Sequence, residues 1–419
     1  MRRVRPGAKI ETRKRITQAA ALTVQGFTLA EIAERFSINP RSVGEWKTKY
    51  PTLWSFAYKE AMKGAVEIVR GQAGSDAVLA DPDRYVNLAK QTEKWLSKRG
   101  ETLFHVNDKP TLTTFLETHY IPTCLFEATA GTIQQYRVIV GQWRLLTGDP
   151  PLEEITTSLL AKYRDVLLKM RGRKPYERMH PRSVCSKLRV VHTLLAKAAK
   201  PGPRNRDAFG LIGEPPWIRP PRCPQTPRTI VSEQQISDLY LAAVCMEVPR
   251  IPGFKAPAWW RALIVVAWAT GLRTSTLLTL RMDDIDWQEK CLRIPGERMK
   301  ARRPHTAYLA DTAVEHLRKI RTDRELVFPW DLNRRQLYFH MHKLQDAAGL
   351  PRKDHFAFQT IRRSFGTRLF AVSPGAAMMA LGHAGLEVTR NCYINAQVVV
   401  QPAVQAMSQP PAFTGGPAA

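Results

Sequence analysis

The stretch TGLRTSTLLTLRMDDIDW, residues 270–287, decides the fold of the C-terminal half of the chain. It follows an apolar run, ALIVVAWA (262–269), whose composition is typical of a helix buried inside a domain. Gly271 stands where that helix should break, Arg273 follows the break, and TSTLLTL begins a second helix. The acidic DDIDW then leads into a strand. We therefore predict a buried helix, a glycine turn that carries an arginine, a short helix and a first strand.

The residues beyond this stretch predict a small sheet followed by helices. CLRI (291–294) and TAYL (306–309) are expected to form strands on either side of a basic turn, PGERMKARRP (295–304). FAFQTIRRSFGTRLF (356–370) has helical periodicity. LGHAGLEVTRNCY (381–393) closes the pattern with a histidine and a tyrosine one short helix apart. The expected fold is mainly α, with a small antiparallel sheet in the C-terminal domain.

The charge balance of the chain indicates a polyanionic partner. The 419 residues include 63 Lys and Arg against 37 Asp and Glu, a formal net charge of +26. Such an excess attracts nucleic acid or an anionic membrane surface and says little about the fold. Hydrophobic residues make up 44% of the chain, so most of it should fold into packed domains.

Nucleic acid is favoured over a membrane as that partner. The most apolar run, residues 262–272, is far shorter than the ~20 residues that a membrane-spanning helix needs. The basic N-terminus is not followed by the apolar segment of a signal peptide. The six cysteines form no CxxC pair, which argues against a disulfide framework and a structural zinc site. A cytoplasmic protein is expected, associated with the nucleoid if the source is bacterial.

The N-terminal residues contain a second informative stretch, GFTLAEIAERFSINPRSVGEWKTKY (26–50). Its first half places apolar residues on one helical face, and Asn39 and Pro40 have the chemistry of an N-cap and a first helical residue. Two short helices joined by a tight turn resemble a helix-turn-helix, whose second helix meets base edges in the major groove. A plain helical hairpin is the alternative. The expected DNA contacts are Arg41, Ser42, Glu45 and Lys47.

Composition and periodicity divide the chain into six regions. Helical segments with basic polar faces precede a stretch rich in Pro, Gly and Arg, which can hold neither a regular helix nor a central strand. We expect a helix-turn-helix region (1–60), a helical connector (61–108), an all-helical domain (109–200), a linker (201–228), a globular domain (229–398) and a flexible tail (399–419).

The predicted helices, strands and turns of residues 229–398, in their order along the chain, resemble the catalytic domain of the tyrosine recombinases, the family of phage-type integrases. The family pattern is Arg, Lys, His-x-x-Arg, His and Tyr. TGLRTSTLLTLRMDDIDW is similar to the first arginine box of the family, and QTIRRSFGT is similar to the second. The family lysine lies in a turn nine residues before a Leu that ends the next strand, and Lys300 lies nine residues before Leu309. The helical domain before it matches the family's core-binding domain in position, size and charge. The resemblance implies a catalytic set of Arg273, Lys300, Gln359, Arg362, His383 and Tyr393.

Two alternatives remain within this assignment. Arg302 or Arg303 could face the phosphate in place of Lys300, and these two arginines are expected to bind DNA. Arg362 and Arg363 could exchange roles. Nearby, DDID supplies three carboxylates, Asp283, Asp284 and Asp286, but no fourth carboxylate or histidine adjoins them in the sequence, so we favour a loop that enters a strand over a metal site.

The chain departs from the family pattern at three places. Gln359 stands where the family has its first histidine; an amide can donate a hydrogen bond to phosphate but cannot transfer a proton. Thr276 stands where a glutamate is common. Ten residues separate His383 from Tyr393, one more than is usual in the family. These departures are typical either of a divergent enzyme or of a decayed one that only binds DNA.

The resemblance implies a site-specific recombinase or integrase that cleaves and rejoins DNA through a 3′-phosphotyrosyl intermediate. Two arginines would clamp the phosphate, the tyrosine would attack phosphorus, and the lysine would protonate the leaving 5′-oxygen. This chemistry requires no metal and no ATP. The implied partners are double-stranded DNA, three further copies of the chain on synapsed DNA, and accessory DNA-bending or directionality proteins. The alternatives are a DNA-binding regulator with a relic catalytic domain, and a type IB topoisomerase or telomere resolvase.

Overall fold

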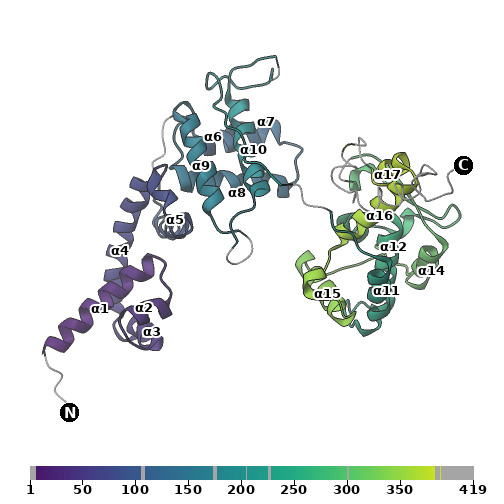
Figure 1. Ribbon diagram of the computed structural model, residues 1–419, viewed down its shortest axis with the longest axis horizontal. Coiled ribbons are helices and arrows are strands. Elements are labelled where there is room, and N and C mark those ends of the chain that lie inside the picture. Colours follow the sequence, from purple (N-terminus) through teal and green to yellow (C-terminus); the bar gives the residue numbers. More distant parts are fainter. Residues whose placement is uncertain are drawn as a thin grey trace, which may run out of the picture. The chain divides into compact units, whose positions relative to one another are not determined.

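The computed structural model divides into two compact units, Met1–Pro224 and Gln225–Ala419 (Figure 1). The structure describes residues 6–104, 109–172, 177–203, 205–224, 228–299, 302–382 and 387. Among the described residues, no helix has both the length and the apolar character that crossing a membrane requires.

The first unit begins with four helices that share a small core. The long helices α1 and α4 pack along each other, and the short helices α2 and α3 lie against them. Ile32 and Ala33 of α2 and Val43 of α3 are buried in this core. The bounds are Pro6–Val24 for α1, Leu29–Arg35 for α2, Pro40–Lys49 for α3 and Pro51–Gln72 for α4.

Side-chain caps define the turn between α2 and α3. Thr28 and Glu31 form a capping box at the start of α2. Asn39 Oδ1 accepts a hydrogen bond of 2.9 Å from the Arg41 amide, and Pro40 occupies the first turn of α3, which confirms the predicted cap. Leu29 in the first turn of α2 is 39% exposed, because it lies beyond the core.

The remaining helices of the first unit pack around a second core. This core includes Val66 and Val69 of α4, Tyr85 of α5 and Trp143 of α8, and it also takes in Ile212 from the Pro-rich stretch. A five-residue π-helical stretch, Leu116–Tyr120, separates α6 from α7. The helix bounds are Pro82–Ser97 for α5, Leu112–Phe115 for α6, Ile121–Cys124 for α7, Ala130–Thr147 for α8, Thr157–Lys169 for α9 and Pro181–Ala198 for α10.

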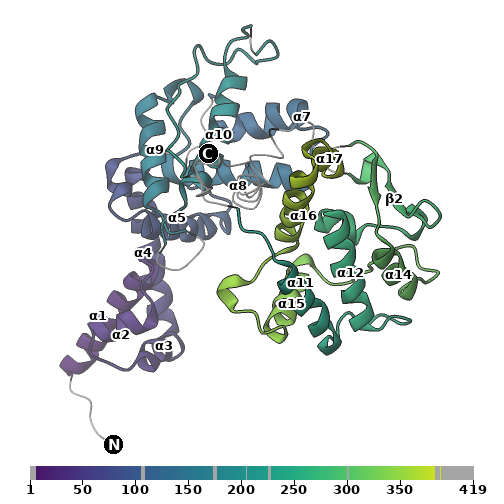
Figure 2. The same ribbon diagram turned by 45° about the vertical axis from the view of Figure 1, so that its right-hand side comes forward.

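The second unit combines helices with a three-stranded antiparallel sheet in the order β1-β2-β3. This confirms the mainly helical fold with a small antiparallel sheet that the sequence predicts. Figure 2 shows the sheet at the edge of the unit, with α12 between α14 and α16. The bounds are Glu233–Ala242 (α11), Ala256–Thr270 (α12), Thr274–Leu278 (α13), Ile285–Asp286 (β1), Cys291–Ile294 (β2), His305–Tyr308 (β3), Asp311–Lys319 (α14), Arg334–Ala347 (α15), Phe358–Val372 (α16) and Pro374–Ala380 (α17).

Helix α12 is the centre of the second core, as its apolar sequence predicts. Trp259, Trp260 and Ile264 are fully buried, and α11, α14 and α16 pack against the helix. Because α12 is surrounded in this way, the turn at its end has a fixed place inside the unit. That turn carries Gly271 and Arg273.

Gly271 ends α12 for a conformational and a steric reason. Its φ of +60° lies in the left-handed region, and its amide donates to the Ala267 carbonyl at 3.0 Å. A Cβ at this position would collide with the ring of Phe365 on α16. The turn therefore requires glycine both for its backbone and for the close approach of α16.

We predict that Gly271→Ala destabilises the second unit by about 2–4 kcal/mol. Left-handed backbone costs a non-glycine residue about 1–2 kcal/mol, and the overlap with Phe365 adds about 1–2 kcal/mol. Urea unfolding of the full chain measures the change. Gly349→Ala is the matched control, since Gly349 also has a positive φ, +73°, but no atom lies within 4 Å of the added methyl. Equal losses in the two variants would contradict the predicted clash.

Candidate active site

Arg362 links three elements of the second unit. It lies on α16 with only 2% of its surface exposed. Its Nη1 donates to the Gly271 carbonyl and its Nη2 to the Leu381 carbonyl, each at 2.7 Å. Buried charge is costly unless hydrogen bonds compensate it, so these two bonds hold the guanidinium in one place. They also join the turn after α12 to the end of α17.

Arg273 belongs to the same turn after α12 that Arg362 bonds. It is the N-cap residue of α13, two residues beyond Gly271, and its side chain is half-buried. Both Arg273 and Arg362 lie close enough to His305 to lower the pKa of its imidazole, after burial as the largest cause. Two of the predicted catalytic residues therefore converge, and His305 joins them.

No motif in the sequence marks His305 as a site residue. It is the first residue of β3, five residues beyond Lys300, in a segment where the basic residues attract attention. Only the packing of β3 against the end of α17 places the imidazole beside the arginines. The periodicity of the strand alone could not have identified it.

Gln359 and Arg363 occupy different positions on α16. Gln359 is exposed in the first turn of the helix, three residues before Arg362, so the two share a helical face. Arg363 donates from Nη1 to the Thr229 carbonyl at 3.3 Å, at the beginning of the unit. Of the two adjacent arginines, Arg362 is the one bonded to the Gly271 turn.

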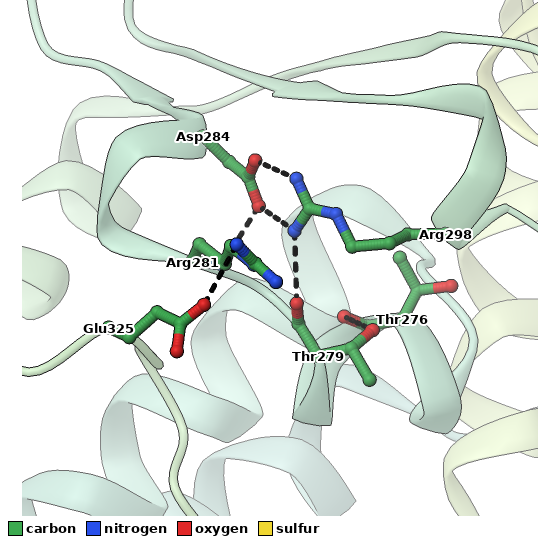
Figure 3. A network of polar contacts seen from close by, with 6 residues as sticks. All are labelled: Thr276, Thr279, Arg281, Asp284, Arg298 and Glu325. Atoms are coloured by element: carbon green, nitrogen blue, oxygen red, sulfur yellow. Dashed lines mark hydrogen bonds and ion pairs between the residues drawn. The ribbon is translucent and has the colours of Figure 1, made fainter.

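A buried ion pair holds the turn between β2 and β3 (Figure 3). Asp284, 5% exposed, accepts hydrogen bonds from both terminal nitrogens of Arg298, one of them 2.7 Å long. Arg298 also donates to the Thr279 carbonyl at 3.1 Å. The neighbouring Met299 is buried, and its Sδ lies 4.0 Å from the Thr276 hydroxyl. The residues just before Lys300 are thus anchored to α13 and to the loop before β1.

The other carboxylates of the DDID segment also have structural partners. Asp286 accepts hydrogen bonds from the Gln288 and Glu289 amides and from Arg293, and these interactions lower its pKa, that with the Glu289 amide most. Asp283 is exposed. Within the described ranges, no three His, Cys, Asp or Glu side chains come together as metal ligands would.

Several predicted site residues lie at or beyond the limits of the described chain. Lys300, His383 and Tyr393 are outside the described residues. Arg302 and Arg303 have exposed side chains at the far end of the turn. Gly382, the last residue before His383, has a φ of +60° and lies against the His305 ring. The described chain therefore leads to His383 from a point beside Arg362 and His305.

The predicted DNA contacts of the first unit lie on α3. Arg41 is highly exposed, and Glu45 pairs with Arg41 at 3.4 Å and with Lys49 at 2.6 Å. Lys47 is exposed and lies over the Trp54 ring. Ser42 is half-buried. Helix α3 thus presents basic side chains at its exposed surface, with Glu45 between two of them.

Two family models match parts of the chain. The model described as "Phage integrase family" matches residues 231–398, which contain all the elements of the candidate active site. A second model, described as "Putative ATPase subunit of terminase (gpP-like)", matches residues 14–60. The second match covers α2, α3, most of α1 and the beginning of α4.

Relatives and solved structures are similar over larger parts of the chain. Tyrosine recombinase XerD of Vibrio vulnificus (strain YJ016) is 25% identical over 185 residues, 41% of this chain and 57% of that protein. XerD of Xanthomonas campestris pv. campestris is 27% identical over 232 residues, 51% and 68% of the two chains. The chain therefore spans little more than half the length of the first relative.

Two DNA-bound integrase structures share the fold. The Tn1549 transposon integrase (aa 82–397), in complex with circular intermediate DNA, aligns with a TM-score of 0.52 and 14% identity over 71% of this chain and 99% of that one. A lambda integrase (75–356) dimer bound to a COC′ core site aligns with a TM-score of 0.51 and 17% identity, over 72% and 99%. The matched family model, the XerD relatives and the shared fold all relate residues 231–398 to the phage integrase family of tyrosine recombinases.

Proposed function

We infer that the protein is a site-specific DNA recombinase, an integrase that joins or releases a mobile element by cutting and rejoining DNA. The observation that carries this inference is the convergence of Arg273 and Arg362 at the Gly271 turn, next to the segment that leads to His383 and Tyr393. A pair of permanently charged guanidiniums is suited to a phosphodiester, whose transition state gains negative charge. The match of residues 231–398 to the phage integrase family supports the same substrate.

The proposed reaction exchanges one phosphoester for another. The Tyr393 phenol attacks phosphorus while Arg273 and Arg362 bind the non-bridging oxygens. The phosphotyrosyl bond forms as His383 takes the phenolic proton, the bond to the 5′-oxygen breaks, and Lys300 donates a proton to that oxygen. Because the new ester retains the energy of the old one, religation needs no ATP.

The proposed partners follow from this reaction. Strand exchange needs two duplexes and four active sites, so we expect four copies of the chain on synapsed DNA. Helix α3, with exposed Arg41 and Lys47, is suited to bind DNA outside the crossover site. Accessory bending or directionality proteins complete the proposed assembly.

A DNA-binding regulator with a relic active site is the second candidate. Gln359 and Thr276 in place of the usual histidine and glutamate favour it. Retention of both arginines, with Arg362 fixed by two short hydrogen bonds, favours the enzyme. Exchange between two duplexes, rather than relaxation of one, distinguishes a recombinase from a topoisomerase.

Tyr393→Phe should abolish covalent attachment to DNA and leave DNA binding unchanged, because only the nucleophilic oxygen is lost. Nicked duplexes that carry sites from the ends of the protein's own element are incubated with the chain and separated on a denaturing gel. The wild-type chain should form an adduct. Binding without an adduct on any such site would support the regulator instead. Tyr308→Phe, at an exposed tyrosine of β3, is the control.

Asp284→Asn should slow cleavage by roughly 10–100-fold, because it frees Arg298 and misplaces the Lys300 turn. The defect should disappear on a duplex with sulfur in place of the scissile 5′-oxygen. A thiol is far more acidic than an alcohol, so the thiolate leaves without a proton donor. Single-turnover rates on the two duplexes measure the effect. Asp286→Asn, which removes a more exposed ion pair, is the control. Equal losses on both duplexes would refute a role for the pair through Lys300.

Replacing Arg41 and Lys47 together with Ala should weaken DNA binding by the first unit without changing cleavage of a short core duplex. If each contacts a phosphate, the slope of log K against log salt falls by about 1–2, since each phosphate contact contributes about 0.9. Fluorescence anisotropy over a range of salt concentrations measures the slope. Lys63→Ala on α4 removes a positive charge away from α3 and should cause little change. An unchanged slope in the double variant would exclude α3 as the DNA-binding helix.

A further inference from the structure

Two cysteine thiols of the first unit lie in contact, although they are 38 positions apart in the sequence. Cys185 lies on α10, and Cys223 lies in the Pro-rich stretch near the end of the unit. Their Sγ atoms are 3.2 Å apart, and the Pro221 carbonyl lies within reach of both thiols, at 3.3 and 3.7 Å. Both cysteines are free thiols. In the part of the chain that the structure describes, no His, Asp or Glu joins them as a third metal ligand.

The segment that carries Cys223 runs back along one face of α10. Trp217 stacks on His192, with ring centroids 6.1 Å apart, and the next residue, Ile218, is buried in the core of the first unit. Cys185 lies about two helical turns before His192, on the same helix. The segment therefore follows α10 from its C-terminal half toward its beginning, and the thiol pair ends this contact just before the first unit ends.

The positions of the two sulfur atoms suit a disulfide bond. A disulfide has an S–S distance of about 2.05 Å, so the sulfurs need to approach by little more than 1 Å. Both cysteines are half-buried, which leaves them within reach of a small oxidant. Burial raises the pKa of the Cys185 thiol, with the hydrogen bond to Cys223 as the next cause, so the neutral thiol is the resting form near pH 7.

We propose that Cys185 and Cys223 form a redox modification site, at which a small-molecule disulfide converts the two thiols into a disulfide bond. One protein thiolate attacks the reagent, whose S–S bond breaks, and a mixed disulfide and one small thiol result. The second protein thiolate attacks the protein sulfur of the mixed disulfide and releases the second small thiol. The two protein thiols thus lose two protons and two electrons, and the reagent gains both. A dithiol reductant reverses the reaction.

The disulfide shortens the free chain between the two units. With both thiols reduced, noncovalent contacts alone hold the chain beyond the buried Ile218 to α10. The second unit holds the chain at Val231, thirteen residues after Ile218, where the Val231 amide donates to Ser364 Oγ at 2.7 Å. A covalent bond at Cys223 leaves eight residues, so the greatest span of this chain falls from about 45 Å to about 28 Å at ~3.3–3.6 Å per residue. This role is independent of the proposed recombinase reaction.

Peptide mapping of the full chain by mass spectrometry tests the bond. Incubation with oxidised glutathione should join the peptides that contain Cys185 and Cys223, with a combined mass two hydrogens below their sum, and dithiothreitol should separate them. Cys185→Ser and Cys223→Ser should each retain glutathione on the remaining thiol, because no second thiol displaces it. Cys245→Ser, at an exposed cysteine, is the control and should form the bond as the wild-type chain does.

Limited trypsin digestion measures the effect on the free chain. Arg222 is exposed beside Cys223, and a protease cuts where the chain opens locally. Cleavage after Arg222 should be lost in the oxidised chain over a time in which the reduced chain is cut completely. Cleavage after Arg352, an exposed residue of the second unit, should be unchanged. Cys185→Ser should be cut after Arg222 with or without oxidised glutathione.

Two outcomes would overturn the proposal. The first is a wild-type chain in which oxidised glutathione modifies the exposed Cys245 but leaves Cys185 and Cys223 unlinked. The second is a linked chain that trypsin cuts after Arg222 as fast as the reduced chain. The two serine variants change α10 and the segment beside it separately, so a folding defect in one of them does not decide the result.

Discussion

The two hydrogen bonds of the buried Arg362 guanidinium are the constraint on which the candidate active site depends. A buried cation must be hydrogen-bonded, and the two carbonyls that accept from it belong to the turn after α12 and to the end of α17. Satisfying one side chain therefore brings three distant segments of the chain to one point. Arg273 follows the first of these carbonyls, and His383 follows the second.

A buried hydrogen-bonded pair also constrains the turn between β2 and β3. A long basic turn in isolation would sample many conformations, because its charges repel one another and its backbone has no ladder partners. Here Arg298 is tied to buried Asp284 and Met299 enters the core, so the turn is attached at one side. Asp284 is thus a structural carboxylate of the site, although its neighbours in the sequence resemble metal ligands.

Local signals in the sequence predicted much of the fold. The glycine break after α12, the Asn39 cap, the bounds of β2 and the helix that carries Arg362 all depend on neighbouring residues, and the structure agrees with each. The sequence did not predict the place of His305 or the Asp284–Arg298 pair. The groups that these side chains meet are distant in the sequence and belong to no recognisable motif with them.

The sequence by itself determined that the C-terminal half resembles the catalytic domain of the tyrosine recombinases, because arginines, a lysine, a histidine and a tyrosine follow one another in the order of the family pattern. Order along the chain does not determine distance in space. Only the tertiary structure decided that Arg362 rather than Arg363 bonds the Gly271 turn and that Asp284 neutralises Arg298. It also decided that the His305 imidazole from β3 lies near enough to both Arg273 and Arg362 for them to lower its pKa, after burial as the largest cause. The physical reason is burial: which polar groups are enclosed together depends on the packing of α12, α16 and the sheet, and enclosed polar groups must satisfy one another.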